Sequence, residues 1–280
     1  MARQRRHRRA GGTIVVAGVV VCVCVGGSGC SSRGAAAEDS RAGRPVQVLH
    51  QAADRLVDAG SSKASTSMEM ATGGTRVTIR GEGVYDYRDR LGRLKVLLPQ
   101  DPAGTRAQRP ITELLAPGAL FMKNRGAGVP ADKWVRVDTA TLSDGNLVTG
   151  GATDPFAAAE VLRGTRNATY VGRTELAGTE VRHYRGTADL AQAAKDASAA
   201  NRKPLEAAAK GFATAEVPFD AYLDDQGRIR KVRHRFSFVN GQQAGTVAVA
   251  STTLLYDFGA PVHVRLPDDD DIYAGKIAEG

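Results

Sequence analysis

Apolar and polar residues alternate along several segments of the chain, and this alternation predicts β-strands. The clearest case runs from Thr75 to Tyr87. One parity of this segment holds the apolar residues Val77, Ile79, Tyr85 and Tyr87, and the other holds Arg76, Thr78, Arg80, Glu82 and Asp86. Because successive side chains of a strand point to opposite faces, we expect an antiparallel strand with one buried and one wet face.

Similar segments recur along the chain, separated by Gly, Pro, Asp and Asn turn signals. The further strands we expect are Met68 with its neighbours, 93–98, 119–123, 134–137, 167–172, 179–186, 216–223, 229–239 and 246–258. The turns D-D-Q-G at 224–227 and N-G at 240–241 suit tight hairpins. In the strand 229–239, His234 lies on the apolar parity with Val232, Phe236 and Phe238. The pattern predicts antiparallel meanders.

Three segments carry helical signals instead. Residues 45–60 begin with Pro45, repeat apolar residues at helical spacing and end at Gly60. Residues 154–164 have Asp154 at the N-cap position, followed by a proline. Residues 189–210 are rich in alanine, and we expect Pro204 to break this helix or to start a second piece. Its thin apolar face predicts a helix that packs lightly and moves.

The N-terminus has the pattern of an export signal. Five of the first nine residues are arginine, and the uncharged, valine-rich run 13–25 follows. Thirteen helical residues span roughly 20 Å, less than the ~30 Å of a bilayer core, so a membrane-spanning helix is the weaker interpretation. Ser28-Gly29-Cys30 resembles the lipobox of bacterial lipoproteins, although Gly27 stands where that motif usually has Leu or Val. The alternative is an ordinary secretory signal with an incidental cysteine.

The lipobox resemblance implies that Cys30 is lipidated and becomes the first residue of the mature chain. Cys22 and Cys24 would leave with the signal, so we expect no disulfide in the mature protein. The boundaries that we predict are a signal peptide at 1–29, a flexible tether at 30–44 and a single domain at 45–280. Without the five N-terminal arginines, 33 basic residues face 30 acidic ones, so the charge gives no reason to expect nucleic-acid binding.

Over nearly the whole mature region the chain resembles the actinobacterial LppX/LprG lipoproteins, whose domain is similar to the LolA-type half-barrel. The stretches that carry the resemblance are V84-Y-D-Y, A119-L-F-M-K, K133-W-V-R-V-D, D154-P, Y170-V-G, L176-A-G-T, the run 217–232 and F258-G-A-P-V-H-V-R-L-P. The resemblance implies an α+β fold, with a strongly curved antiparallel sheet and helices on its concave face. In some members an apolar cavity takes the acyl chains of envelope lipids or glycolipids.

Half-wet strands covered by few helices make such a cavity physically plausible. The residues that we expect to line it are Val77, Ile79, Val96, Leu120, Met122, Phe219, Phe236, Phe238, Val247 and Val249. Each buried CH₂ of a ligand would contribute about 0.8 kcal/mol, so acyl chains need no polar anchor.

The sequence offers no motif for catalysis, a cofactor or a metal. The histidines lack metal-ligand spacing, and His234 fits a core or pocket histidine better than a catalytic one. The run Asp268–Asp271 fits a solvated acidic tail better than a calcium site, because four consecutive side chains cannot face one ion. The arginines of 228–235 fit a solvated strand face, with contact to anionic lipid headgroups as the alternative.

Two functions therefore remain open. The first is a lipoprotein on the extracytoplasmic face of the cell membrane that binds a lipid or glycolipid and carries or presents it. The second is an anchored interaction or sensing module that docks an envelope protein, with no lipid ligand. A core closed by the chain's own side chains would favour the second. A hydrolase would require a serine or carboxylate beside His234.

Overall fold

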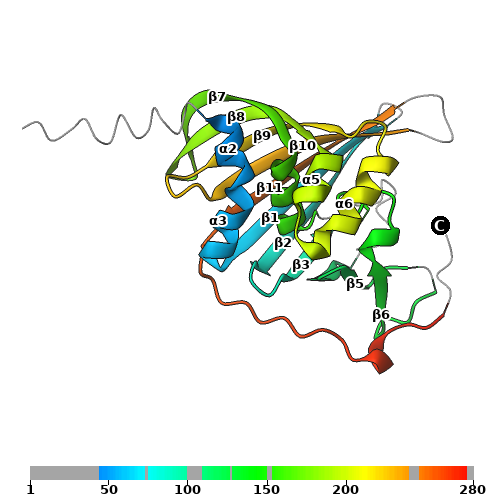
Figure 1. Cartoon of the computed structure of the whole chain (residues 1–280). Helices are drawn as coiled ribbons and strands as arrows, with labels where there is room; N and C mark the ends of the chain where they lie inside the picture. The colour runs from blue at the N-terminus through cyan, green and yellow to red at the C-terminus, as the bar shows by residue number, and fades with distance from the viewer. Residues whose placement is uncertain are drawn as a thin grey trace, which may run out of the picture. The chain divides into compact units, whose positions relative to one another are not determined.

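Eleven strands form one antiparallel sheet in the computed structural model, which describes residues 44–72, 75–99, 109–126, 128–149, 153–239 and 246–275 (Figure 1). The strands are β1 Ser61–Thr72, β2 Thr75–Asp86, β3 Leu91–Leu97, β4 Ile111–Ala116, β5 Ala119–Lys123, β6 Trp134–Asp138, β7 Thr165–Leu176, β8 Thr179–Asp189, β9 Glu216–Leu223, β10 Ile229–Val239 and β11 Thr246–Tyr256. Every strand that the alternation predicted is present. The strand β4 is an addition, and β11 ends two residues earlier than expected.

The sheet consists of two meanders joined side by side. Its strand order is β6-β5-β4-β3-β2-β1-β11-β10-β9-β8-β7. The first and last strands of the chain pair with each other, with Lys63 opposite Tyr256 and Ala71 opposite Ala248. This long-range pairing places both meanders in one continuous surface.

One face of the sheet is covered by helices, and the long strands bend around them (Figure 1). We call this side the concave face. Inward positions on several strands are buried, for example Ala64 and Met68 on β1 and Phe219 on β9. The outward positions between them are largely exposed or half-buried, as the alternation requires. The expected fold class is confirmed.

The segment 45–60 forms two short helices rather than one. Helix α2 spans Pro45–His50 and α3 spans Ala52–Ala59, with Gln51 between them. Leu49 and Leu56 are fully buried against the rest of the core. Helix α4 spans Pro155–Val161, and Asp154 caps it by accepting hydrogen bonds from the backbone N–H groups of Phe156 and Ala157, as predicted.

The alanine-rich segment also divides, but not at Pro204. Helix α5 spans Leu190–Asp196 and α6 spans Ala199–Gly211, so Pro204 lies inside α6 and the expected break there is wrong. The break falls at Ser198, whose backbone N–H and hydroxyl both donate to the buried carboxylate of Glu160. A contact with α4 therefore ends α5, and local propensity does not decide it.

The C-terminal segment packs on the outer face of the sheet, opposite the helices. Val264, Leu266 and Ile272 contact a small apolar cluster formed by Leu114, Ala119 and Phe121. Three short 3₁₀ turns complete the described part: η1 Thr139–Thr141, η2 Leu162–Gly164 and η3 Asp269–Asp271.

The predicted signal peptide, Cys30 and the tether up to residue 43 lie outside the described residues. Among the helices that the structure does describe, none combines the length and the apolar character needed to cross a membrane.

Candidate functional site

The ten residues expected to line a cavity lie together on the concave face. Those that are buried are Ile79, Val96, Leu120, Met122, Phe219, Phe236 and Val249, and those half-buried against them are Val77, Phe238 and Val247. All ten belong to one apolar cluster with the helices. Their side chains lie on six strands of the sheet and face its helices.

The chain's own helices occupy the space above this face. We use the word cover for the three helices α4, α5 and α6. Every residue of α4 is buried, and its Phe156 ring lies 6.5 Å from the Tyr85 ring and 6.1 Å from the Tyr87 ring, measured between centroids. The described helices therefore fill much of the space above this face with their side chains. Val249, one of the ten predicted residues, lines a hollow at the surface together with Met70 and Arg233.

One end of the concave face is less completely covered by the residues that the structure describes. We call this end the mouth and define it by four half-buried apolar residues, Met70, Val77, Phe238 and Val247. Met70 lies opposite Val77 across β1 and β2, and Phe238 lies opposite Val247 across β10 and β11. Three of the four are residues that the sequence pattern had selected.

Phe212, directly after α6, contacts the β10 side of the mouth. Its ring stacks on Phe236 at 4.8 Å and meets Phe238 edge-on at 4.6 Å between centroids. The next residue, Ala213, donates its backbone N–H to the carbonyl of Ser237 at 2.7 Å. The end of the cover is therefore fixed to the mouth by one aromatic ring and one backbone hydrogen bond.

His234 lies where the alternation placed it, inside the core. Burial lowers the pKa of its imidazole to about 3, so the ring is neutral. Its Nε2 has no hydrogen-bond partner among the described residues. Ser251 stands opposite it on β11, but the Ser251 hydroxyl shares a hydrogen bond with Thr153. The described structure thus places a serine beside His234 without coupling the two as nucleophile and base.

Sequence patterning missed a second buried polar group, Glu113 on β4. Its side chain shares the inward parity with Ile111 and Leu115 and is fully buried. Burial raises the pKa of the carboxyl group to about 8, against a smaller opposing effect of Arg125. Neither carboxyl oxygen has a hydrogen-bond partner among the described residues. Glu113 is therefore protonated at neutral pH.

The arginines of 228–235 have different partners, and Arg235 belongs to a network around the carboxylate of Asp220. Burial raises the pKa of Asp220, but hydrogen bonds from His183, Arg185 and Arg235 outweigh this effect and hold the pKa at about 2. Arg233 lies 3.5 Å from Glu69. These basic side chains are half-exposed or exposed and largely compensated.

The acidic run near the C-terminus is exposed. All four side chains of Asp268–Asp271 face solvent, and Asp268 pairs with Arg265 at 3.2 Å. In the part of the chain that the structure describes, no group of three or more His, Cys, Asp or Glu side chains is arranged to hold a metal ion.

No family model matches the chain, and no curated protein matches it. Among solved structures, the chain is similar to the lipoprotein LppX of Mycobacterium tuberculosis, with 10% sequence identity, a TM-score of 0.43, and coverage of 78% of this chain and 99% of that one. LprF from Mycobacterium bovis is 14% identical with a TM-score of 0.39, and the similarity covers 80% of this chain and 97% of that one.

A putative outer membrane lipoprotein-sorting protein domain from Vibrio parahaemolyticus is 11% identical with a TM-score of 0.33, over 79% of this chain and 95% of that one. The resemblance expected from the sequence is thus also found among solved structures. At these identities and TM-scores, no ligand or partner follows from it.

Proposed function

We propose that the chain is a membrane-anchored extracytoplasmic lipoprotein that binds the acyl chains of a lipid or glycolipid between the concave face and its cover, and carries or presents them. Cys30 would hold the lipid anchor, and the tether 30–44 would carry a single domain at 45–280. The observation that supports this function best is the continuous apolar concave face, which short helices cover and which is partly open at the mouth.

The composition of the cover favours its movement. Six of its buried residues are alanines: Ala157, Ala158, Ala159, Ala193, Ala194 and Ala208. Alanine buries little apolar area, so displacing these helices loses little hydrophobic free energy per residue. Acyl chains in their place would recover it at about 0.8 kcal/mol per buried CH₂.

Buried polar atoms on the concave face also favour an open arrangement, in which the helices no longer cover these atoms. Thr66 Oγ1 and His234 Nε2 are buried without hydrogen-bond partners among the described residues, in addition to the Glu113 carboxyl group. An unsatisfied buried polar atom costs about 1–3 kcal/mol. These costs weaken the closed arrangement relative to one in which the atoms meet water or a ligand headgroup.

The mouth offers a matched pair of variants to test acyl-chain binding. Phe238 is half-buried on the concave face, whereas its neighbour Val239 points outward and is 73% exposed. Phe238→Asp would place a charge where acyl chains enter, and Val239→Asp places the same charge on the wet side. We expect native mass spectrometry of the full-length protein, extracted from membranes, to show bound acylated lipid in the wild type and Val239→Asp, and about tenfold less in Phe238→Asp.

Absence of any acylated species from the wild-type protein would contradict the proposal, as would equal lipid in both variants. Thermal unfolding of each variant serves as the folding control. Phe238→Ala, which enlarges the mouth without a charge, is expected to retain lipid and separates a charge effect from a packing effect.

A second candidate function is an anchored module that docks an envelope protein. The filled interior favours it, because a closed core needs no ligand. On this alternative no lipid co-purifies, and Phe238→Asp lowers stability without changing any ligand. The mass-spectrometric comparison therefore distinguishes the two functions.

A further inference from the structure

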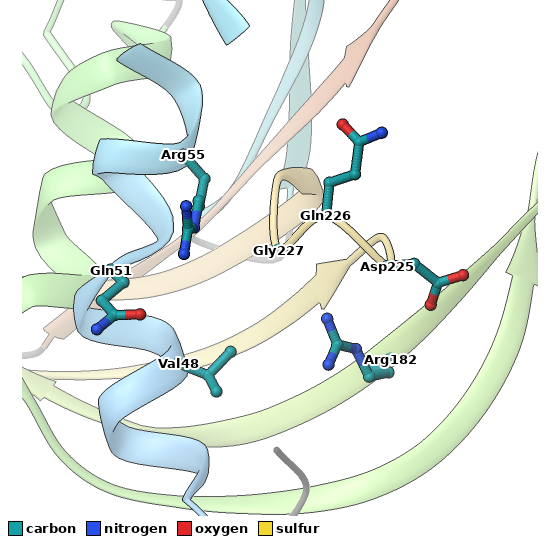
Figure 2. A pocket seen from close by; sticks show the side chains of 7 residues that line it. All are labelled: Val48, Gln51, Arg55, Arg182, Asp225, Gln226 and Gly227. Carbon is teal, nitrogen blue, oxygen red and sulfur yellow. The ribbon is translucent and has the colours of Figure 1, made fainter. Parts of the chain in front are cut away.

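A cleft lies between the helix pair α2–α3 and the turn that joins β9 to β10 (Figure 2). Its volume is about 310 Å³, and it is lined by Val48, Gln51, Arg55, Arg182, Asp225, Gln226 and Gly227. The turn lies at the opposite end of β10 from the mouth. The cleft is therefore separate from the route proposed for acyl chains.

Arg182, on β8, supplies a buried positive charge to the cleft. The residue is 4% exposed. One guanidinium nitrogen donates to the backbone carbonyl of Asp224 at 2.9 Å, while Nε has no hydrogen-bond partner within the described residues. No carboxylate in the described ranges forms an ion pair with it. Because a buried cation is costly without a counter-ion, this guanidinium favours an anion from outside the chain.

Arg55 faces the same cleft from α3. Figure 2 shows its guanidinium extending from the helix toward the space before the turn. Gly227 has φ of +79°, a conformation that favours glycine, and the turn lies in ordinary contact distance of the Arg55 side chain. Its guanidinium pairs with the exposed carboxylate of Asp58, at 3.5 Å. Two guanidinium groups thus approach one cleft from different walls.

The remaining wall residues leave the cleft positive. Gln51 and Gln226 are uncharged, and Figure 2 shows the Gln226 side chain pointing away from the helix pair. Asp225 is the one acidic residue of the lining, and Figure 2 shows its carboxylate pointing away from the helices. It lies 3.7 Å from Arg173 instead. The adjacent Asp224 carboxylate is compensated by Arg228 at 2.8 Å.

We propose that this cleft binds a phosphate group. A tetrahedral oxyanion offers acceptors in several directions, which suits guanidinium groups that approach from α3 and from β8, whereas a carboxylate offers them in one plane. The volume admits a phosphate with part of its substituent. This inference goes beyond acyl-chain carriage and does not depend on it. The phosphate group could belong to free phosphate or to a phospholipid headgroup, which share this chemistry.

The test is a calorimetric titration of the purified full-length protein with inorganic phosphate. We expect saturable binding of phosphate to the wild type and about tenfold weaker binding to Arg55→Ala. The reason is that a hydrogen bond between two charged groups contributes more binding free energy than a neutral one. Arg55 is exposed, so this variant is expected to fold even if Arg182→Gln does not. Arg202→Ala, which removes one positive charge from an exposed position on α6, is the matched control and should bind like the wild type. Asp225→Asn should bind several-fold more tightly, because the one acidic wall residue is neutralised.

Vesicles separate the two sources of phosphate. If the site takes a headgroup, we expect phosphatidylglycerol vesicles to bind, inorganic phosphate to compete with them, and Arg55→Ala to weaken this binding. Phosphatidylcholine vesicles carry the same phosphodiester without net charge, so they show whether net lipid charge is needed. If the site takes the free ion, inorganic phosphate binds and vesicles do not compete. No saturable phosphate binding in either form, or equal binding in Arg55→Ala and Arg202→Ala, would overturn the proposal. Phe238→Asp should leave phosphate binding unchanged, so failure here is distinct from failure of lipid carriage.

Discussion

Glu113 holds a proton in the folded chain at neutral pH, because burial raises the pKa of its carboxyl group from 4.5 to about 8. Below the lower value the carboxyl is neutral in both the folded and the unfolded chain. As the pH rises from 4.5 to 8, the unfolded chain loses this proton and the folded chain keeps it. The contribution of Glu113 to stability is therefore present at low pH and is lost as the pH rises through this window.

Glu113→Gln should remove this dependence. The amide stays neutral in both states, so the free energy of unfolding should no longer fall by up to about 1.4 kcal/mol per pH unit across the window. Urea unfolding at several pH values measures the slope. Glu206→Gln, at an exposed position on α6, is the control and should keep the wild-type slope. An unchanged slope in Glu113→Gln would show that another group causes it.

His234 has the opposite dependence. Burial lowers the pKa of its imidazole from 6.5 to about 3, so between these values the unfolded chain binds a proton that the folded chain does not. The free energy of unfolding should fall as the pH decreases through this range. His234→Phe, between Phe219 and Phe236, should flatten the acid side of the stability curve. The exposed His263→Gln should not change it, and identical curves for both variants would contradict the assignment.

The two residues differ in how readily the sequence locates them. The inward position of His234 follows from the alternation of β10, and the structure confirms it. Glu113 was missed because β4 is buried on both faces, which hides the alternation in I-T-E-L-L-A. Its Leu114 faces outward but is covered by Val264 and Leu266 of the C-terminal segment. Only the tertiary structure reveals that contact.

At the scale of elements, local signals located the helices but not their ends. Asp154 and Pro155 specify the start of α4 within the sequence itself. The separation of α5 from α6 depends on Glu160, which lies 38 residues from Ser198 along the chain. Pro204 was a reasonable breaker by propensity, yet tertiary contacts decided the boundary.

Gly211 allows the end of α6 to lie close to the loop that follows η1. A Cβ on Gly211 would lie 1.9 Å from the carbonyl oxygen of Ser143, closer than packing allows. Gly211→Ala should therefore push the end of α6 away from this loop, even though alanine is the better helix former. We expect faster amide hydrogen exchange in α5 and α6, with little change in β1, β10 and β11.

Lys210→Ala, one residue earlier and exposed, is the control for this variant and should exchange like the wild type. Faster exchange throughout the sheet would indicate global destabilisation instead of a moving cover. Exchange in wild-type α5 and α6 as slow as in the central strands would contradict the mobility predicted from their thin apolar face.

At the scale of the whole molecule, the strand pattern predicted meanders and their buried faces. It did not predict that β1 would join β11, because strand pairing across nearly 200 residues leaves no periodic signal in either segment. The strand pattern also did not predict that the chain's own helices would fill the space above the concave face. Whether helices cover a concave face depends on side-chain contacts between distant elements, and the short, alanine-rich cover contributes buried residues to the core there.

The attachment of the whole molecule to the membrane can be tested at the cysteines. Cys30 follows Ser28-Gly29, whereas Cys24 lies within the apolar run that would be removed. Lipidation of Cys30 would bury acyl chains in the bilayer at about 0.8 kcal/mol per CH₂, enough for stable anchoring when more than one chain is attached. In a bacterial host that lipidates exported proteins, Cys30→Ala should shift the full-length chain from the membrane fraction to the soluble fraction. Cys24→Ala should stay in the membrane fraction, because it leaves the attachment site intact. Retention of Cys30→Ala would mean that the uncleaved apolar run, and not a lipid on Cys30, is the anchor.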